Sequence, residues 1–472
     1  MLTMAKEKRS VLPVLRKIRS LHFVGIGGTG MCGMAEVLFN LGYRVTGSDL
    51  APSEATDRLF KLGIPVAFGH KPENIFGANV LVVSSAVKDD NPEIKEARKE
   101  KIPVIRRAEM LGDLMRMKFG IAVSGTHGKT TTTSMIGQIL SSAGLDPTIV
   151  VGGRVVNLET NAKLGEGEFM VCEADEYDRS FLMLSPHIAV ATNLEADHLD
   201  YYKNLDEIKE AFVQFLNRVP FYGTILLCAD EANLRLIEPL LTRPVLRYGI
   251  ICPAKDCDFW GENIRMEGLA THFVIKTKLG EKQEITLHVP GLHNVKNAIA
   301  AAAAGREIGL PWDKIAVGLA EFRGVRRRFE IKGKGRGVIV VDDYAHHPTE
   351  IETTIQAART AFPKNRLIAV FQPHLFSRTR DFALEFAVAL SHADRAVVTE
   401  IYPSREQPIP GVTSALILEG FEKVGYKNFD FVAKWEDVPQ VLLPQLKEGD
   451  LVITLGAGSI YRASEKLVEL LK

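Results

Sequence analysis

The residues best suited to chemistry lie in one loop rich in glycine and threonine. It reads Ser124-Gly125-Thr126-His127-Gly128-Lys129-Thr130-Thr131 and joins an apolar run, residues 119–124, to a helical pattern. In such a loop successive backbone N–H groups face phosphate oxygens, the lysine reaches the β and γ phosphates, and the hydroxyl after it binds magnesium. Val123 stands where the Walker pattern has its first glycine. The order strand, Gly-Lys-Thr, helix nevertheless predicts that residues 125–131 bind ATP and that Thr130 binds Mg²⁺.

Carboxylates follow the next strand-like run, residues 169–172. Magnesium takes hard oxygen ligands and needs only one or two from the protein. Glu173 is the first candidate because it stands at the expected strand end, and Asp175 and Glu176 are alternatives that could equally be solvated. His198 closes a second polar group (Asn193, Glu195, Asp197 and His198) after residues 187–192. A lone histidine is usually structural, but this position predicts a metal or phosphate role.

A second glycine loop stands near the N-terminus. Gly25, Gly27 and Gly30 form G-x-G-x-x-G between an apolar strand and a helix, and Asp49 ends the following strand. This arrangement predicts a pyrophosphate at the helix N-terminus and a carboxylate near a ribose. NAD and a UDP-sugar both fit it. Polar residues expected at the same sheet edge, each of which could also be merely solvated, are His70, Ser84 and Arg107.

Three blocks of alternating strand and helix patterns carry these loops. The expected strands are residues 22–26, 43–47, 80–84, 119–124, 169–172, 187–192, 338–341, 366–371, 396–399 and 451–455. This rhythm predicts parallel sheets. We expect an α/β protein of three domains: a Rossmann-like N-terminal domain (1–117), a P-loop-type central ATPase domain (118–330) and a Rossmann-like C-terminal domain (331–472). The alanine run, residues 298–304, predicts a buried helix.

Composition narrows the class of protein. The 472 residues suggest three domains at about 150 residues each. With 58 basic and 58 acidic residues the net charge is zero, so we expect no nucleic acid and no membrane as partner. Without a signal sequence or a long apolar run we expect a cytoplasmic protein, a monomer or weak homodimer. The five cysteines are expected to be reduced, and the spacing of Cys252 and Cys257 disfavours zinc.

The chain resembles the Mur ligases over nearly its whole length. The motifs that carry the resemblance begin at His22 (HFVGIGGTGM), Gly125 (GTHGKTTT), Glu173 (EADE), Asn193 (NLEADH), Gly291 (GLHNVKNA), Arg326 (RRRFE), Asp342 (DDYAHHP) and Gln372 (QPHLFSRT). The resemblance implies that the first domain binds a UDP-sugar, the second ATP and magnesium, and the third the incoming amino acid. Within the family it favours the branch that adds L-alanine to UDP-N-acetylmuramate.

The resemblance also implies roles for single residues. UDP-sugar contacts would be Gly27, Gly28, Thr29, Gly30, Asp49, His70, Ser84 and Arg107; further ATP contacts would be Asn294, Arg327 and Asp343; metal ligands would be Thr130, Glu173 and His198; amino-acid contacts would be Tyr344, His347, Arg378 and Arg380. Lys129, Glu173, His198, Arg327 and His346 would serve catalysis. The expected reaction forms an acyl phosphate from ATP and the muramoyl carboxylate, which the amine then attacks. His346, His347 and His198 are candidate bases.

Two departures from the family pattern keep alternatives open. Glu210-Ala211-Phe212 occupies the stretch where many members carry a carbamylated lysine, so we predict none here. Glu176-Tyr177-Asp178 is similar to the branch that attaches a recycled tripeptide. That ligase is the nearest alternative. An NAD-dependent oxidoreductase, supported only by the first loop and Asp49, and a nucleotide-dependent switch, supported only by the second loop, are the others.

Overall fold

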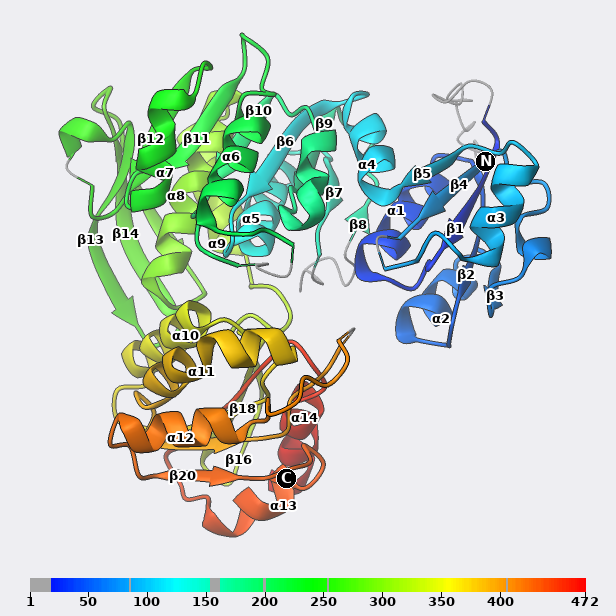
Figure 1. Cartoon of the computed structure of the whole chain (residues 1–472). Helices are drawn as coiled ribbons and strands as arrows, with labels where there is room; N and C mark the ends of the chain where they lie inside the picture. The colour runs from blue at the N-terminus through cyan, green and yellow to red at the C-terminus, as the bar shows by residue number, and fades with distance from the viewer. Residues whose placement is uncertain (1–17, 85, 153–161, 198–200, 253, 405) are drawn as a thin grey trace, which may run out of the picture. The chain divides into compact units, whose positions relative to one another are not determined.

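The structure is a computed structural model that describes residues 18–84, 86–152, 162–197, 201–252, 254–404 and 406–472 (Figure 1). The chain forms two compact units. One comprises the described residues up to Leu246 together with Ala303–Leu310, and the other comprises Arg247–Ala302 and Pro311–Lys472. Among the described residues, no helix is both long enough and apolar enough to span a membrane.

The first sheet of the first unit is parallel throughout, with the order β3-β2-β1-β4-β5 (Figure 1). Every residue of β1 and β4 is buried, as expected of strands whose two faces are both covered. Because parallel strands end at one edge, the glycine loop after β1 lies beside the ends of β2 and β4. The elements are β1 (Ser20–Val24), α1 (Thr29–Asn40), β2 (Arg44–Asp49), α2 (Glu54–Lys61), β3 (Val66–Phe68), β4 (Val80–Val83), α3 (Pro92–Lys99), β5 (Val104–Arg106) and α4 (Arg107–Met115).

The second sheet of this unit is built around β6, the strand that leads into the phosphate loop. β6 pairs in parallel with β10 on one side and β9 on the other. β11 lies beyond β10, while β7 and the short antiparallel β8 lie beyond β9. The elements are β6 (Phe119–Ser124), α5 (Lys129–Ser142), β7 (Thr148–Val150), β8 (Ala162–Lys163), β9 (Phe169–Glu173), β10 (Ile188–Ala191), α6 (Leu205–Leu216), β11 (Thr224–Cys228) and α7 (Ala232–Ile237).

The second unit begins within β12 (Val245–Gly249) and contains an antiparallel ribbon that the sequence patterns did not reveal. Its strands are β13 (Phe259–Glu267), β14 (Ala270–Thr277) and β15 (Lys282–Leu287). α8 (Leu292–Glu307) confirms the helix expected from the alanine run, since Ala298 and Ala300 to Ala304 are fully buried. α9 (Trp312–Glu321) follows it.

The C-terminal sheet has the order β16-β17-β21-β18-β19-β20, parallel except for β16. Neighbouring residues of one strand enter different cores: Val341 packs with residues of α10 to α12, and Val340 with residues of α13 and α14. Helices therefore cover both faces, and the doubly wound α/β prediction is confirmed. The elements are β16 (Glu330–Gly335), β17 (Val338–Asp343), α10 (Pro348–Ala361), β18 (Arg366–Phe371), α11 (Phe376–Leu390), β19 (Arg395–Val398), α12 (Ala415–Lys423), β20 (Phe429–Phe431), α13 (Val438–Leu442), β21 (Asp450–Leu455) and α14 (Tyr461–Leu471).

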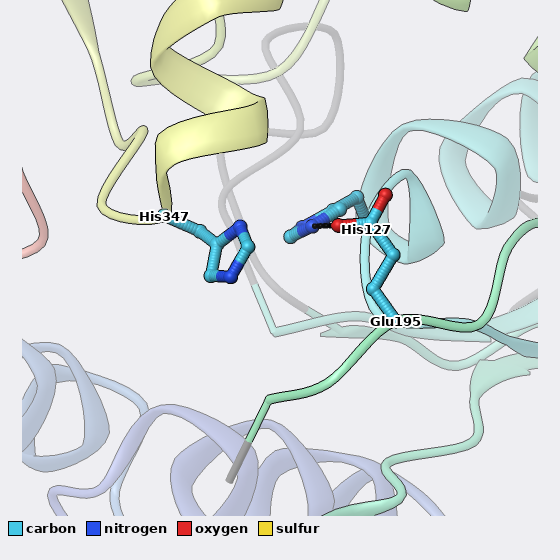
Figure 2. Close-up of side chains that lie close together, drawn as sticks. All are labelled: His127, Glu195 and His347. Atoms are coloured by element: carbon cyan, nitrogen blue, oxygen red, sulfur yellow. Dashed lines mark ion pairs between the residues drawn. The ribbon is translucent and has the colours of Figure 1, made fainter. Parts of the chain in front are cut away.

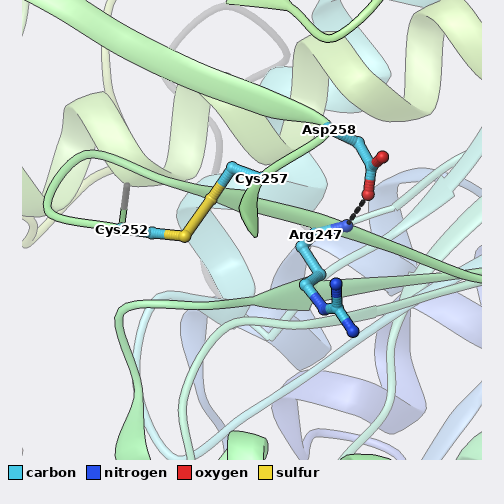
Figure 3. The surroundings of a disulfide bond; sticks show 4 residues. All are labelled: Arg247, Cys252, Cys257 and Asp258. Atoms are coloured by element: carbon cyan, nitrogen blue, oxygen red, sulfur yellow. Dashed lines mark hydrogen bonds between the residues drawn. A yellow bond between two sulfur atoms is a disulfide. The ribbon is translucent and has the colours of Figure 1, made fainter. Parts of the chain in front are cut away.

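One expectation about the cysteines was wrong. Cys252 and Cys257 form a disulfide in the turn between β12 and β13 (Figure 3). The ends of this turn are held together because the Arg247 N–H donates to the Asp258 carboxylate at 2.8 Å, and the Asp258 N–H donates to the Arg247 carbonyl at 2.8 Å. That closure brings the two thiols into reach. Cys32, Cys172 and Cys228 are buried thiols.

Candidate active site

The phosphate loop needs glycine at two positions because of its backbone. Gly125 and Gly128 have φ of +139° and +81°, where residues with a side chain are strained. A Cβ on Gly125 would also lie 2.0 Å from the Thr192 hydroxyl oxygen. That hydroxyl donates to the His127 carbonyl at 2.6 Å. The loop is thus fixed by the end of β10, and α5 starts directly after Gly128.

The polar residues after β10 brace the loop from outside. The Asn193 amide oxygen accepts from the His127 N–H at 2.8 Å, and the Glu195 N–H donates to the Thr126 hydroxyl at 2.9 Å. The Glu195 carboxylate also lies 3.5 Å from Nε2 of His127 (Figure 2). This part of the expected cluster therefore lies at the phosphate loop. His198 is outside the described residues.

Lys129 is bound by the loop itself and by a buried carboxylate. Its ammonium donates to the carbonyls of Gly125 and Thr126 and lies 2.9 Å from both carboxylate oxygens of Glu176. The Tyr202 hydroxyl donates to the Glu176 carbonyl and fixes the backbone there. Burial alone would lower the pKa of Lys129, but Glu176 and the nearby carboxylates outweigh it and raise that pKa. Glu176 is 3% exposed, so the expectation that it could be solvated was wrong.

Glu173 ends β9 beside the loop, as predicted, because its strand partner is Val123 at the end of β6. Its carboxylate accepts from the Gly152 N–H at 2.7 Å and from the Thr130 side chain. Burial raises the pKa of Glu173, and these two hydrogen bonds and Lys129 oppose the rise. A carboxylate and a hydroxyl side by side are the hard oxygen donors that suit Mg²⁺.

The first glycine loop is held by β2. Gly25 and Ile26 N–H groups donate to the Ser48 carbonyl, and Gly27 N–H donates to the Asp49 carboxylate at 2.7 Å. Asp49 therefore orders the loop directly. The N-terminus of α1 follows at Thr29; Met31 and Cys32 N–H groups donate to the Gly28 carbonyl, and the N–H groups before them are left to bind an anion.

Arg107 brings a cation to the start of α1. A Cβ on Gly30 would lie 2.4 Å from the Arg107 guanidinium, so the glycine lets this side chain lie against the start of α1 in its present position. The same guanidinium is 3.9 Å from the Asp175 carboxylate. It thus lies between the first glycine loop and the carboxylates that follow β9.

The first glycine loop and the end of β9 line one cavity of about 230 Å³ within the first unit. The expected residues that line it are Gly28, Gly30, Ser84 and Arg107 from the first domain and Glu173 from the second. Its other lining residues are Met31, Ala108, Leu111, Val150, Val151, Gly152, Asp175, Ser180, Phe181 and Leu184. His70 is not among them; it binds Ser48, at the end of β2. Thr131 lies in the first turn of α5.

In the second unit Arg327 is tied to the carboxyl ends of β17 and β21. Its guanidinium donates to Asp342 at 2.9 Å and to the Gly456 carbonyl at 2.6 Å, and it lies over the rings of Tyr344 and Tyr461 at 5.0 and 4.7 Å. Burial raises the pKa of Asp342, and Arg327 opposes this. A γ-phosphate would have to compete with Asp342 for this arginine.

The histidines expected near the amino acid lie at the start of α10. His346 Nδ1 is 2.9 Å from the Tyr344 carbonyl, which can only accept, so Nδ1 carries the proton and a neutral ring keeps its lone pair on Nε2. That arrangement suits a base. His347 is buried against the ring of Phe382, 5.0 Å away.

Two further expected residues of this unit are buried. Asp343 is buried and accepts the N–H groups of Phe329 and Ala345; burial raises its pKa to about 6. Asn294 is buried and donates to the Pro290 carbonyl at 2.7 Å.

The two arginines of α11 differ in exposure. Arg378 is buried near the ring nitrogen of His374 at 3.4 Å, whereas Arg380 is exposed and pairs with the adjacent Asp381. Only Arg378 is therefore fixed by the fold at the end of β18.

Comparison with models of known protein families shows which family the chain belongs to. The chain matches the models "Mur ligase family, catalytic domain" over residues 20–119, "Mur ligase middle domain" over 123–305 and "Mur ligase, glutamate ligase domain" over 327–458. It therefore belongs to the Mur ligase family.

Two kinds of ligase are among the proteins to which the chain is similar. The chain is 52% identical to a UDP-N-acetylmuramate–L-alanine ligase of Geotalea daltonii, over 97% of this chain and 99% of that protein. The crystal structure of such a ligase from Thermotoga maritima matches with a TM-score of 0.81 and 32% identity, over 96% and 98% of the two chains. A murein peptide ligase from Psychrobacter arcticus matches with a TM-score of 0.71 and 26% identity, over 96% and 98%.

Proposed function

We propose that this protein is an ATP-dependent ligase that joins L-alanine to the carboxylate of UDP-N-acetylmuramate in peptidoglycan precursor synthesis. The observation that carries the proposal is the cavity that extends from the start of α1, at Gly28 and Gly30, to Glu173, whose carboxylate accepts from the Thr130 side chain of the phosphate loop. An anion at the start of α1 and a nucleotide phosphate at the phosphate loop would then both lie near Glu173. Among the solved structures the L-alanine ligase is more similar than the murein peptide ligase, with 32% against 26% identity and a TM-score of 0.81 against 0.71, which favours alanine over the tripeptide.

The domain division that we propose is 1–117 for the UDP-sugar, 118–330 for ATP and 331–472 for the amino acid. UDP-sugar contacts come from Gly27, Gly28, Thr29, Gly30, Asp49, His70, Ser84 and Arg107. ATP contacts come from residues 125–131 with Asn294, Arg327 and Asp343. Amino-acid contacts come from Tyr344, His347, Arg378 and Arg380. A cytoplasmic monomer or weak homodimer stays a prediction.

Mg²⁺ is proposed to bind at Thr130, Glu173 and His198. The adjacent carboxylate and hydroxyl of Glu173 and Thr130 fit a hard divalent cation. When bound, it would neutralise phosphate charge. Lys129 holds the phosphates from the loop, and Glu176 keeps the ammonium at the loop before nucleotide arrives.

The proposed reaction has two steps, formation of an acyl phosphate and attack on it by the amine. A muramoyl carboxylate oxygen takes the γ-phosphoryl group of ATP, which releases ADP and leaves an acyl phosphate. The uncharged amine of L-alanine attacks the carbonyl carbon, loses a proton, and phosphate leaves as the amide forms. His346 is the proposed proton acceptor through Nε2. Catalysis depends on positioning the substrates and neutralising phosphate charge, because the protein forms no covalent bond with them.

The test is phosphate release with ATP and UDP-N-acetylmuramate, offering L-alanine, glycine, L-serine or the tripeptide in turn. We expect L-alanine to give the highest kcat/KM. Lys129→Ala is expected to abolish release while leaving UDP-sugar binding nearly intact. Release that depends on the tripeptide and not on L-alanine would show the alternative ligase to be right.

A further inference from the structure

All the hydrogens of the Lys129 ammonium already have acceptors within the protein. A lysine ammonium has three donors and no acceptor. That of Lys129 donates to the carbonyls of Gly125 and Thr126, and it lies 2.9 Å from both carboxylate oxygens of Glu176. A phosphate oxygen can therefore bind Lys129 only if one of these three acceptors gives way.

The three acceptors differ in charge and in origin. Gly125 and Thr126 offer uncharged carbonyls of the same loop, whereas Glu176 brings a negative charge from the segment after β9. The Glu176 side chain is 4% exposed, so water screens this charge little. A phosphate at the same ammonium would be a like charge a few ångströms away. Glu176 is therefore the acceptor that a phosphate opposes.

The fold holds Glu176 in this position from behind. Its backbone carbonyl accepts from the hydroxyl of Tyr202 at 2.5 Å, and Tyr202 is itself buried. The Arg179 guanidinium lies 5.8 Å from the centre of the Tyr202 ring and donates to Glu207 at 2.7 Å. These contacts fix the segment that carries the carboxylate, so Glu176 is presented to Lys129 by its surroundings.

We infer that Glu176 competes with the β and γ phosphates of the nucleotide for Lys129 and thereby weakens nucleotide binding. The inference rests on the proposed function, which supplies the nucleotide at this loop. Binding exchanges the Lys129–Glu176 ion pair for a contact between Lys129 and phosphate, and the ion pair forms again when ADP leaves. Glu176 is a positioning residue, because it acts on the nucleotide through Lys129.

The test is isothermal titration calorimetry of the full chain with ADP at one fixed concentration of Mg²⁺. Glu176→Gln keeps the size of the side chain and removes its charge. We expect ADP to bind this variant at least about fivefold more tightly than the wild type, because the competing charge is gone. A role of Glu176 in structure alone would weaken ADP binding. Unchanged or weaker binding of ADP would therefore overturn the inference.

A ligand, a conservative variant and a control variant show whether the gain comes from Lys129. AMP has no β phosphate to reach Lys129, so its affinity should change by less than about twofold in Glu176→Gln. Glu176→Asp keeps the charge and should bind ADP within about threefold of the wild type. Glu96→Gln removes an exposed carboxylate beside Lys99 and should keep the wild-type affinity. A gain for AMP or in Glu96→Gln equal to that for ADP in Glu176→Gln would contradict the competition.

Tyr202→Phe decides the question if Glu176→Gln does not fold. It removes only the hydroxyl that holds the Glu176 backbone. With the carboxylate held less firmly opposite Lys129, ADP is expected to bind at least about twofold more tightly. Unchanged or weaker binding in this variant would overturn the inference.

Failure of this inference and failure of the proposed function give different results. Alanine-dependent phosphate release together with unchanged ADP affinity in Glu176→Gln would refute only the competition for Lys129. Absence of phosphate release with UDP-N-acetylmuramate, L-alanine and ATP would refute the ligase.

Discussion

Glu176→Gln removes the charge opposite Lys129 while keeping the volume of the side chain. Glu176 is buried and Lys129 is mostly buried, with side-chain exposures of 4% and 15%. Removing one partner of a buried ion pair costs about 3–5 kcal/mol, because the other charge stays buried without compensation. Lys129 keeps two carbonyl acceptors and has Asp175 and Glu173 nearby. We therefore expect the lower end, a loss of about 3 kcal/mol in the free energy of unfolding.

The assay is urea denaturation of the ligand-free protein, with Glu96→Gln as control. Glu96 lies 2.8 Å from the Lys99 ammonium, a contact of nearly the same length, but the Lys99 side chain is 70% exposed. An exposed pair contributes only about 0–1 kcal/mol, so the control should lose less than that. Equal losses in the two variants would refute the reasoning. Lys129→Met combined with Glu176→Gln should lose less than the sum of the two single changes, because no charge is left unpaired.

Three further predictions concern the acyl phosphate, the role of Glu173 and the titration of Asp343. Hydroxylamine, added with ATP and UDP-N-acetylmuramate but no amino acid, is expected to trap a hydroxamate; ligation without trapping would contradict a free acyl phosphate. Glu173→Gln is expected to cut turnover by about two or more powers of ten and weaken ATP binding only modestly, as measured by steady-state kinetics and nucleotide titration. Asp343 protonates more readily in the folded protein, where its pKa is about 6. Stability relative to Asp343→Asn should therefore fall as pH rises from about 4 to about 6, in thermal unfolding across that range.

The sequence predicts the sheets and the strand ends well, for a physical reason. Parallel strands covered on both faces are continuous apolar runs, and the residues after them meet at one edge. Glu173 ends one strand that flanks β6 and Asn193 follows the other, and both lie at the phosphate loop as expected. The antiparallel ribbon was missed although Gly268 and Gly280, both with positive φ, mark its two hairpins. Its strands alternate buried and partly exposed residues, a weaker signal than an apolar run.

The choice between neighbouring carboxylates could not be predicted. In Glu173-Ala-Asp-Glu176 the spacing does not say which side chain meets Lys129. The chain turns sharply after Glu176, with positive φ at Asp178 and Arg179, and this turn lets Glu176 face inward. The burial of Glu93, in the first turn of α3, was missed for a similar reason: an acidic residue in the first turn of a helix usually faces water and favours the helix dipole.

The third glycine of the first loop acts differently here from its usual role in a dinucleotide fingerprint, where it permits close packing of helix and strand. A Cβ on Gly30 would meet the Arg107 guanidinium rather than a strand. The glycine therefore makes room for a cation at the N-terminus of α1, where the helix dipole already favours an anion. Arg107 also faces Asp175, beyond β9. A site with this extra positive charge, in a cavity that reaches Glu173 beside Thr130 of the phosphate loop, suits a ligand that carries a second anionic group beyond its pyrophosphate. A muramoyl carboxylate is such a group, and a nicotinamide ring is not.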